Sequence, residues 1–567
     1  PITILGRKDI GQGVKGKWVL FKPIVENFTD PLTPLTADLF GMALNLFPGL
    51  QVIKGWCYVN LEVFKAIMPF KAPDQTMAEF IYRLGSQTPP LKISLLKLPL
   101  FLLFALFFYL TQGLIYARSR RIPDDFMDGY RDFARQVDLD DSVGPEISMF
   151  TLWTWPKLFT PIGHLVTLVN LASVRYMIGL DLLRKLVRRY VPDLPADAES
   201  FLCSGSQGVL SAEMGRDIWS LAQEAKRHPP LRELLINNKP EKLLAKVWNV
   251  PEAEEFAAQL DRFLIKHGHR GLKEIELRSS RWEENPAPVL GMVRNYMLVE
   301  SDPNEGERKV EEARKDIESQ IREKLERYPL ERLLGLRWRL IRYVADRVKY
   351  FAKMRENSRY YHIMGLHVVR KKILRLEAQL MRQGRLKCKD DIFFLYRDEL
   401  SQLSAGKLNW ADVEDRVRER RLEHIRLSRM TPPMSIGVEM TEAGPEAAVG
   451  AADKNLLKGQ PASPGQYTGL AHVILDPSMD VELKPGEVLV APFTDPAWTP
   501  LFLTAGAAVV EIGSYLSHAG TVAREFGMPC VVDVPGCTSS LQTGCRVKVD
   551  GFNGLVRIIN QEDDSEK

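Results

Sequence analysis

A histidine near the carboxyl end of the chain stands where a phosphoryl group could be carried. It is His518, which follows a short apolar run at residues 508–512 that predicts a buried strand. Ser517 is a good N-cap residue, and residues 519–526 predict two helical turns that end at Gly527. Backbone N–H groups and the positive end of the helix dipole favour anions at such a helix start. A neutral imidazole there can accept a phosphoryl group, although a histidine that merely caps a surface helix fits the same pattern.

Two arginines form a second group that could handle phosphate. Residues 305–383 predict long amphipathic helices, and Arg355 and Arg359 lie one helical turn apart, so both side chains point the same way. Such a pair of guanidinium groups is suited to clamping a phosphoryl group during its transfer. Arginines at this spacing are also common on exposed helix surfaces, which is the other interpretation.

A third cluster of chemically active residues lies around the glycines of residues 267–284. Its candidate side chains are His269, Arg270 and Glu274, followed by further acids and an Arg-Trp-Glu-Glu run. Histidine, arginine and glutamate together can bind phosphate or shuttle protons. The alternative is a salt-bridged loop between two helices.

The residues around His518 resemble the phosphohistidine swivelling domain of the phosphoenolpyruvate-utilising enzymes. The matching positions are Gly513, Ser517, His518, Ala519, Val522, Ala523, Arg524, Glu525, Gly527, Pro529, Val531 and Val532. The chain departs from the family pattern at Ser514 and Gly520, where one small residue replaces another. Upstream, the match includes the Thr-Asp-Pro-Ala-Trp run at residues 494–498. The resemblance implies that His518 is the phosphorylated residue and that Ser517 and Arg524 bind substrate.

Other motifs resemble the rifampin phosphotransferase-like and phenylphosphate synthase-like branch of this superfamily. They are Asn27 to Thr36, the His-Arg-Gly segment with Glu274, and Arg355-Glu-Asn-Ser-Arg359-Tyr. In the family the basic pair faces the phosphohistidine; here Arg359 stands where lysine is commoner. The resemblance places His269, Arg270 and Glu274 in the acceptor site, with His269 or Glu274 taking the acceptor's proton.

Composition excludes several classes of function. The formal net charge of +4 is small for 567 residues, and no zinc-finger or RNA-binding motif is present, so nucleic acid is not an expected partner. Six scattered cysteines without a Cys-x-x-Cys pair predict neither a disulfide framework nor a metal site, and favour a cytoplasmic location. The chain begins at Pro1, and we expect a trimmed or partial chain.

The most apolar stretch runs without a charge from Leu98 to Ala117. Its length could cross a bilayer, but Pro99 and the Thr-Gln-Gly at residues 111–113 interrupt it. Three interpretations stay open: a buried helix lining an apolar pocket, a peripheral membrane contact, and a true span. A second apolar region, residues 159–183, contains His164, Arg175 and Asp181 and predicts an amphipathic or buried helix.

Three local signals predict further elements. A short strand is expected around residues 56–60, and Thr36 can cap a helix that begins near Ala37. The pair Pro229-Pro230 predicts a boundary within the helical residues 193–300.

These patterns predict a multidomain chain, with a mostly α-helical acceptor-substrate domain followed by a small α/β phosphohistidine swivelling domain. The helical domain covers residues 1–430 and the swivelling domain residues 460–560, with an acidic tail at 561–567. Between the domains, residues 431–459 are rich in Pro, Gly and Ala and predict a flexible linker. A carrier histidine needs such a tether if it loads at one site and unloads at another.

The sequence shows no P-loop and no recognisable ATP-grasp segment, and no pyruvate-handling barrel follows the histidine domain. We therefore expect the acceptor and phosphohistidine component of an AMP-forming, ATP-dependent phosphotransferase. ATP and Mg²⁺ would be bound by an ATP-grasp partner, either a separate subunit or a part lost by truncation. Apolar residues near 95–185 favour an apolar small-molecule acceptor. The alternatives are an ATP-dependent condensing ligase of the same architecture and a non-enzymatic phosphocarrier or membrane scaffold.

Overall fold

The computed structural model divides the chain into two compact units. The first contains residues 1–167, 273–279 and 361–442, and the second contains residues 168–272, 280–360 and 443–567. The domain boundaries predicted from the sequence at residues 430 and 460 stay a prediction. The structure describes residues 14–21, 30–44, 49–82, 91–99, 101–103, 106, 156–194, 198–203, 208–238, 240–247, 250, 253–297, 303–430, 432–438, 455–475, 483–495, 498–515 and 517–559.

The first unit is built on a four-stranded antiparallel sheet of order β2-β3-β1-β6. The strand predicted near residues 56–60 is confirmed as β3. The sheet borders two apolar cores, since Tyr58 packs in one and Val59 in the other. The strands of this unit are β1 (Trp18–Leu20), β2 (Leu50–Ile53), β3 (Trp56–Asn60) and β6 (Ser435–Ile436), and the separate pair β4 (Phe70–Lys71) and β5 (Lys92–Ile93).

Short helices complete the first unit. They are α2 (Pro34–Leu44), α3 (Leu61–Ile67), α4 (Asp74–Tyr82), η2 (Asp391–Phe394), α18 (Arg397–Ser404), η3 (Trp410–Asp412) and α19 (Glu414–Leu427). Of these, α2, α3 and α4 contact the strands of the sheet. The sequence predicted that Thr36 caps a helix starting near Ala37, and this is wrong. The helix starts at Pro34, whose fixed φ suits a first helical position, and the Thr36 hydroxyl instead donates to Glu276 Oε1 at 2.7 Å.

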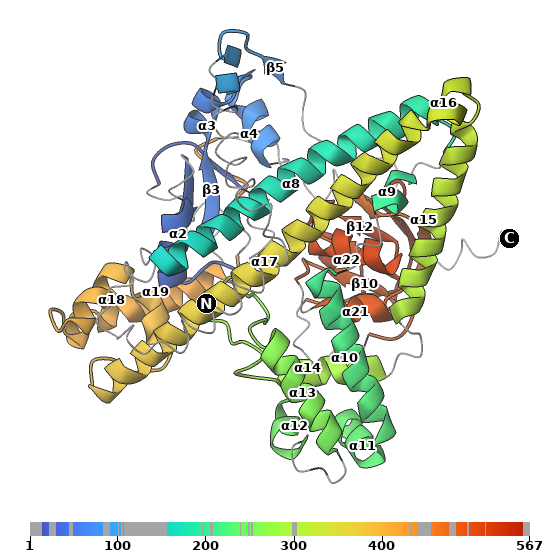
Figure 1. The fold of residues 1–567 in the computed structure, drawn as a ribbon. Coiled ribbons are helices and arrows are strands. Elements are labelled where there is room, and N and C mark those ends of the chain that lie inside the picture. Colours follow the sequence, from blue (N-terminus) through green and yellow to red (C-terminus); the bar gives the residue numbers. More distant parts are fainter. Residues whose placement is uncertain are drawn as a thin grey trace. The chain divides into compact units, whose positions relative to one another are not determined.

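In the helical part of the second unit, residues between 214 and 297 pack around one large apolar core that includes Trp282 and Tyr296. The helices of this part are α9 (Ala198–Cys203), α10 (Leu210–Arg227), α11 (Pro229–Asn237), α12 (Pro240–Val247), α13 (Glu254–His267), α14 (Ala287–Met297), α15 (Pro303–Leu325) and α16 (Pro329–Leu334), and the core is formed from α10 to α14. The Pro-Pro pair predicted as a boundary starts α11, where proline costs no hydrogen bond. Figure 1 shows α16 at the turn between α15 and the long helix that follows.

Two long helices belong to both units: α8 (Pro156–Tyr190) and α17 (Leu336–Arg382). The first confirms the predicted helix over residues 159–183. Within the second unit they lie close, because a Cβ on Gly179 would come within 2.9 Å of Val348 Cγ2. Most of the stretch from Leu98 to Ala117 lies outside the described residues. Among the helices that the structure does describe, none combines the length and the apolar character needed to cross a membrane.

The carboxyl-terminal domain of the second unit is an eight-stranded mixed sheet with order β7-β14-β13-β9-β10-β11-β12-β8. Strands β9 to β12 run parallel, and the others pair antiparallel. The strands are β7 (Leu456–Lys458), β8 (Gln460–Ser463), β9 (Gln466–Val473), β10 (Val488–Ala491), β11 (Ala507–Val510), β12 (Cys530–Val532), β13 (Arg546–Asp550) and β14 (Leu555–Ile558). Both β6 and β7 lie inside the range predicted as linker, whose middle, residues 439–454, is outside the described residues, as is the acidic tail at 561–567.

Helices cover both faces of this sheet, in keeping with an α/β domain. They are α21 (Thr499–Thr504), α22 (His518–Phe526) and α23 (Cys537–Ser540). One face packs α21 and α22 against residues such as Leu489 and Val510, and the other packs α23 against Val490 and Val509. Figure 1 shows α22 with β10 and β12 in this domain. The strand–helix–strand order predicted around His518 is confirmed by β11, α22 and β12.

Candidate functional site

The topology of the parallel strands places the candidate histidine at their carboxyl-terminal ends. Thr494 follows β10 and His518 follows β11, and these two strands are parallel neighbours. The carboxyl ends of parallel strands share one edge, where ligands bind in open α/β sheets. His518 begins α22 and is only 3% exposed, so it is not a surface cap.

Both imidazole nitrogens of His518 face hydroxyl groups. Nδ1 lies 3.3 Å from Thr494 Oγ1, and Nε2 lies 3.2 Å from Thr499 Oγ1. A hydroxyl can either donate or accept, so the two threonines hold the ring in either neutral tautomer. The Phe502 ring packs edge-on at a centroid distance of 6.0 Å. The imidazole is therefore oriented before any ligand binds.

The electrostatic environment keeps this imidazole neutral. Burial is the main cause that lowers the pKa of His518 well below the usual histidine range, and the charges of Arg359, Arg270 and Arg355 lower it further. A neutral imidazole has a free lone pair, which is the form that attacks phosphorus. The same three positive charges that oppose protonation of His518 would stabilise the negative charge of a phosphoryl group on it.

The arginines near His518 come from two elements of the second unit. Arg355 and Arg359 lie on α17, one turn apart, and the Arg355 Nη2 is 3.3 Å from Glu356 Oε1. Arg270 follows the end of α13, is 2% exposed, and has its guanidinium carbon 5.0 Å from the centre of the Tyr360 ring. The structure thus brings together three arginines that the sequence singled out in two separate motifs.

The segment after α13 is held by backbone hydrogen bonds to the segment that precedes α14. Trp282 N donates to Arg270 O, and Glu283 N donates to Gly268 O, each at 2.9 Å. A Cβ on Gly271 would come within 2.7 Å of the Ser280 carbonyl oxygen, so a glycine is needed there. His269 is buried with its ring edge-on to Tyr360 at 4.6 Å. Glu274 is also buried, but it belongs to the first unit.

The two remaining sequence candidates interact with their own domain. Ser517 occupies the N-cap position of α22, yet its hydroxyl donates to Ser514 O at 2.8 Å and makes no capping bond. Arg524 Nη1 donates to Ala462 O at 2.6 Å, and its guanidinium lies over the Tyr515 ring at 4.1 Å. These contacts tie α22 to β8 and to the turn before the helix.

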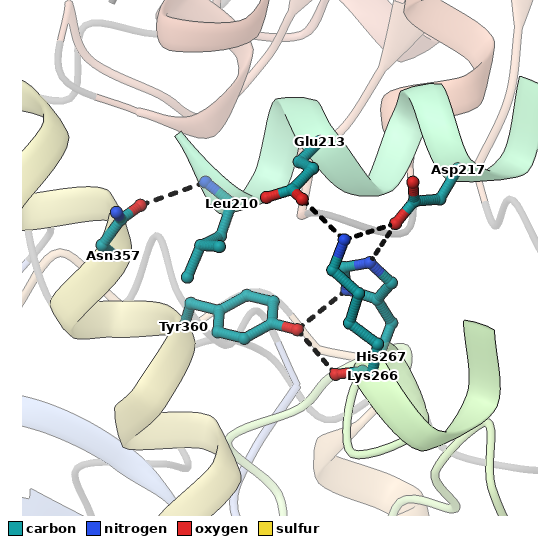
Figure 2. A network of polar contacts seen from close by, with 7 residues as sticks. All are labelled: Leu210, Glu213, Asp217, Lys266, His267, Asn357 and Tyr360. Carbon is teal, nitrogen blue, oxygen red and sulfur yellow. Dashed lines mark hydrogen bonds and ion pairs between the residues drawn. The ribbon is translucent and has the colours of Figure 1, made fainter. Parts of the chain in front are cut away.

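Sequence reasoning missed several residues of this site. Thr494 stands in the Thr-Asp-Pro-Ala-Trp run that matches the family pattern, and Thr499 follows that run directly, so a signal for both was present. Figure 2 shows a further network that includes Asp217, His267 and Tyr360. Nothing near Asp217 in the sequence marks it, because its partner lies 50 positions away. In the part of the chain that the structure describes, no three His, Cys, Asp or Glu side chains gather so as to hold a metal ion.

Comparison with known proteins gives two domain matches. Residues 167–356 match the rifampicin phosphotransferase fourth domain, and residues 483–554 match the mobile domain of PEP-utilising enzymes. The rifampicin phosphotransferase of Streptomyces sviceus is 30% identical over 380 residues, which is 64% of this chain and 41% of that protein. The Bacillus subtilis rifampicin phosphotransferase is 27% identical over 350 residues, 62% of this chain and 40% of that protein. The chain thus spans less than half the length of these relatives.

Proposed function

Since the chain belongs to the rifampicin phosphotransferase-like branch of the PEP-utilising enzymes, we propose that it acts in a phosphotransferase reaction with His518 as the phosphoryl carrier. In this proposal the chain supplies the acceptor-binding and phosphohistidine components. One observation carries it: a buried, neutral imidazole, oriented by two threonines, lies in the field of three arginines.

The first half of the proposed reaction loads His518. An ATP-grasp module binds ATP and Mg²⁺ and supplies the phosphoryl group, with AMP and inorganic phosphate as the other products. The lone pair of one His518 ring nitrogen attacks phosphorus while the hydroxyl at the other nitrogen keeps the ring aligned. We assign ATP and Mg²⁺ to a partner module, either a separate subunit or another part of a longer chain.

The second half passes the phosphoryl group to an acceptor. Arg355, Arg359 and Arg270 neutralise the charge on the phosphoryl oxygens as the phosphorus–nitrogen bond breaks and the bond to the acceptor oxygen forms. His269 takes the proton that the acceptor hydroxyl loses. We propose an apolar small molecule as the acceptor, and rifampicin is the first compound to test because the two relatives described above are named for it.

The test of the carrier role is a labelling experiment. The chain is mixed with an ATP-grasp partner of known activity and [β-³²P]ATP, and acid-labile, base-stable label on the protein is measured. We expect label on the wild type and on His472→Ala, a control that changes another histidine of the same domain, and none on His518→Ala. A wild type that stays unlabelled, or label that survives in His518→Ala, contradicts the proposal.

The identity of the product separates this function from its rivals. The labelled chain is mixed with rifampicin and a panel of phenols, and the small molecules are analysed by mass spectrometry. A stable phosphorylated product supports a phosphotransferase. A condensed product without phosphate indicates a ligase. Label that moves to no acceptor, and that behaves in the same way in Arg355→Ala, indicates a phosphocarrier.

A further inference from the structure

A buried histidine other than His518 lies at the centre of a hydrogen-bond network in the second unit. His267 Nε2 is 2.9 Å from Asp217 Oδ2 on α10, and its Nδ1 is 2.8 Å from the Tyr360 hydroxyl on α17. The Tyr360 hydroxyl also lies 2.8 Å from the Lys266 carbonyl oxygen. Figure 2 shows the three side chains in a row, with the imidazole between the carboxylate and the phenol.

Hydrogen-bond chemistry assigns the protons of this row. The bonds from His267 and Lys266 outweigh burial and lower the pKa of Asp217, so its carboxylate is ionised and can only accept. Nε2 of His267 must then carry a proton. Burial lowers the pKa of His267, so Nδ1 of the neutral ring is an acceptor. The one hydroxyl proton of Tyr360 is then shared between Nδ1 and the Lys266 carbonyl oxygen. If the ring gains a second proton, Nδ1 donates to the phenol oxygen and the hydroxyl donates to the Lys266 carbonyl, so Tyr360 stays bonded in both states.

Further bonds tie the same three elements together. Lys266 Nζ lies 2.6 Å from Glu213 Oε1 and 2.8 Å from Asp217 Oδ2, both on α10. Asn357, one turn before Tyr360 on α17, accepts from Leu210 N at the start of α10. Figure 2 shows this second attachment beside the first. The end of α13 and this part of α17 are thus both fastened to α10.

The phenol ring of Tyr360 connects the network to the candidate site. The guanidinium of Arg270 lies over the ring at 5.0 Å, and the His269 ring meets it edge-on at 4.6 Å. Arg359, whose charge acts on His518, directly precedes Tyr360 on α17. A displacement of the Tyr360 ring would therefore remove the support of Arg270, and a shift of the α17 backbone at Tyr360 would also move Arg359.

We propose that Asp217, His267 and Tyr360 form a positioning network that holds Arg270 and Arg359 against His518. None of the three touches His518 in a hydrogen bond that the described residues show; they act through the arginines. This proposal rests on the proposed function, because it explains how the arginines that act on the carrier histidine are held in place. The charged groups facing His518 are Arg270 from the segment after α13 and Arg355 and Arg359 from α17.

The first test measures the pKa of His518 without any activity. Protein labelled with ¹⁵N-histidine is titrated by NMR, and the His518 signals are assigned by comparison with His518→Gln. In Tyr360→Phe the ring stays but its hydroxyl is lost, so Arg270 and Arg359 become less well placed. We expect the pKa of His518 to rise by about half a unit or more toward the usual histidine value.

A matched control separates positioning from general loosening. Tyr296 is fully buried in the same unit, and its hydroxyl makes no hydrogen bond with the described residues. Tyr296→Phe deletes the same atom and should leave the pKa of His518 unchanged. If Tyr360→Phe does not fold, Asp217→Asn replaces it: the amide removes the charge that fixes the His267 proton, and the same upward shift of the His518 pKa is expected. An unchanged His518 pKa in the folded variant overturns the positioning network.

The second test measures phosphorylation of His518 by phosphoramidate, which needs no partner. The imidazole nitrogen attacks phosphorus, the phosphorus–nitrogen bond of the donor breaks, and ammonia leaves with the imidazole proton. Formation of phosphohistidine is followed by ³¹P NMR, with His518→Ala subtracted. Tyr360→Phe should slow the reaction at His518 by about tenfold, since a small misplacement of charged groups costs that much or more. Equal rates for Tyr360→Phe and Tyr296→Phe contradict the network.

The two proposals fail in different ways. If the wild type takes no label from phosphoramidate or from ATP with the partner, the carrier function fails, while the pKa comparison still decides the network. If the wild type is labelled normally and Tyr360→Phe matches it in both rate and pKa, the network fails and the carrier function stands.

Discussion

The environment of His518 shows how neighbouring groups set the protonation state of a histidine. A solvent-exposed histidine is partly protonated near neutral pH, whereas burial and three arginine charges hold His518 neutral. The two threonine hydroxyls replace the hydrogen bonds that burial takes from the ring. In the proposed function, this neutral imidazole is the nucleophile at physiological pH, and the three arginine charges stabilise the phosphoryl group bound to it.

The pH dependence of phosphorylation tests this environment. Because the pKa of His518 is lowered, its neutral form persists as the pH falls through 6.5, where free imidazole becomes protonated. We expect the rate of His518 phosphorylation by phosphoramidate, relative to free imidazole in the same buffer, to rise as the pH drops from 7.5 to 5.5. Arg359→Ala should reduce that rise, since one of the lowering charges is gone. A constant ratio across this range would mean that His518 titrates normally.

Substitution of Arg524 should lower the free energy of unfolding rather than the rate of phosphoryl transfer. Its guanidinium is buried, donates to Ala462 O and stacks on Tyr515. Arg524→Lys keeps the charge but loses the planar stack and the aimed N–H group, so we expect a loss of about 1–3 kcal/mol in the free energy of unfolding. Urea denaturation measures it, with the exposed Arg546→Lys on β13 as control. A larger effect on phosphate transfer than on stability would instead support the substrate-binding role expected from the sequence.

At the start of α2, Thr33 and Thr36 form a hydrogen-bonded cluster with Glu276. The Glu276 carboxylate accepts from the Thr33 backbone N–H at 2.8 Å and from the Thr33 and Thr36 hydroxyls at 2.8 and 2.7 Å. The Thr36 hydroxyl oxygen also accepts from Leu277 N at 3.2 Å. Two motifs about 240 positions apart thus meet within the first unit, and they fix the helix start to the 273–279 segment.

Removing one hydroxyl from this cluster should loosen α2. Thr36→Val has nearly the same shape but leaves the buried Leu277 N–H without its acceptor and Glu276 without one donor. We expect a loss of about 1.5–3 kcal/mol in the free energy of unfolding of the first unit. Hydrogen exchange of the α2 amides would report it locally. Thr468→Val, at an exposed position of β9, is the matched control and should change stability by less than about 0.5 kcal/mol; a similar exchange rate in both variants refutes the idea.

Across the second unit, the histidine domain and the helical part touch through small residues. Gly527 ends α22 with a φ of 65°, and a Cβ there would come within 2.9 Å of Val310 Cγ2 on α15. Gly215 on α10 lies beside Thr499, whose hydroxyl contacts His518, but a Cβ there would make an ordinary van der Waals contact at 3.5 Å. Glycine is therefore required for the close approach at position 527 and not at position 215.

A comparison of two glycine substitutions tests the importance of this approach. Gly527 and Gly544 both have positive φ, but a Cβ on Gly544 would meet no atom within 4 Å. Both Gly→Ala changes should cost about 1–2 kcal/mol of backbone strain. Only Gly527→Ala also presses against Val310, so only it should slow transfer from phospho-His518 to an acceptor, with loading by the ATP-grasp partner unchanged. Equal transfer rates in the two variants would show that the contact with α15 has no part in transfer.

Local patterns in the sequence predicted many of the helices and strands. Apolar runs ended by glycine and proline predicted β11, α22 and β12, and the periodicity of residues 305–383 predicted α15 and α17, because these signals depend on near neighbours. The same locality put Arg355 and Arg359 on one helix face. It also explains the errors: Thr36 was assigned to a cap because its true partner, Glu276, is far away in the sequence.

The meeting of distant residues needed the folded chain. The sequence named His518, Arg270, Arg355 and Arg359 in three separate segments, but the burial that keeps His518 neutral arises only when helices and sheet pack together. Asp217 and His267 carry no motif that would pair them, and their bond exists because α10 and the end of α13 lie side by side. Residue types and short-range spacing are written in the sequence, whereas solvent exclusion and long-range contacts are properties of the packed structure.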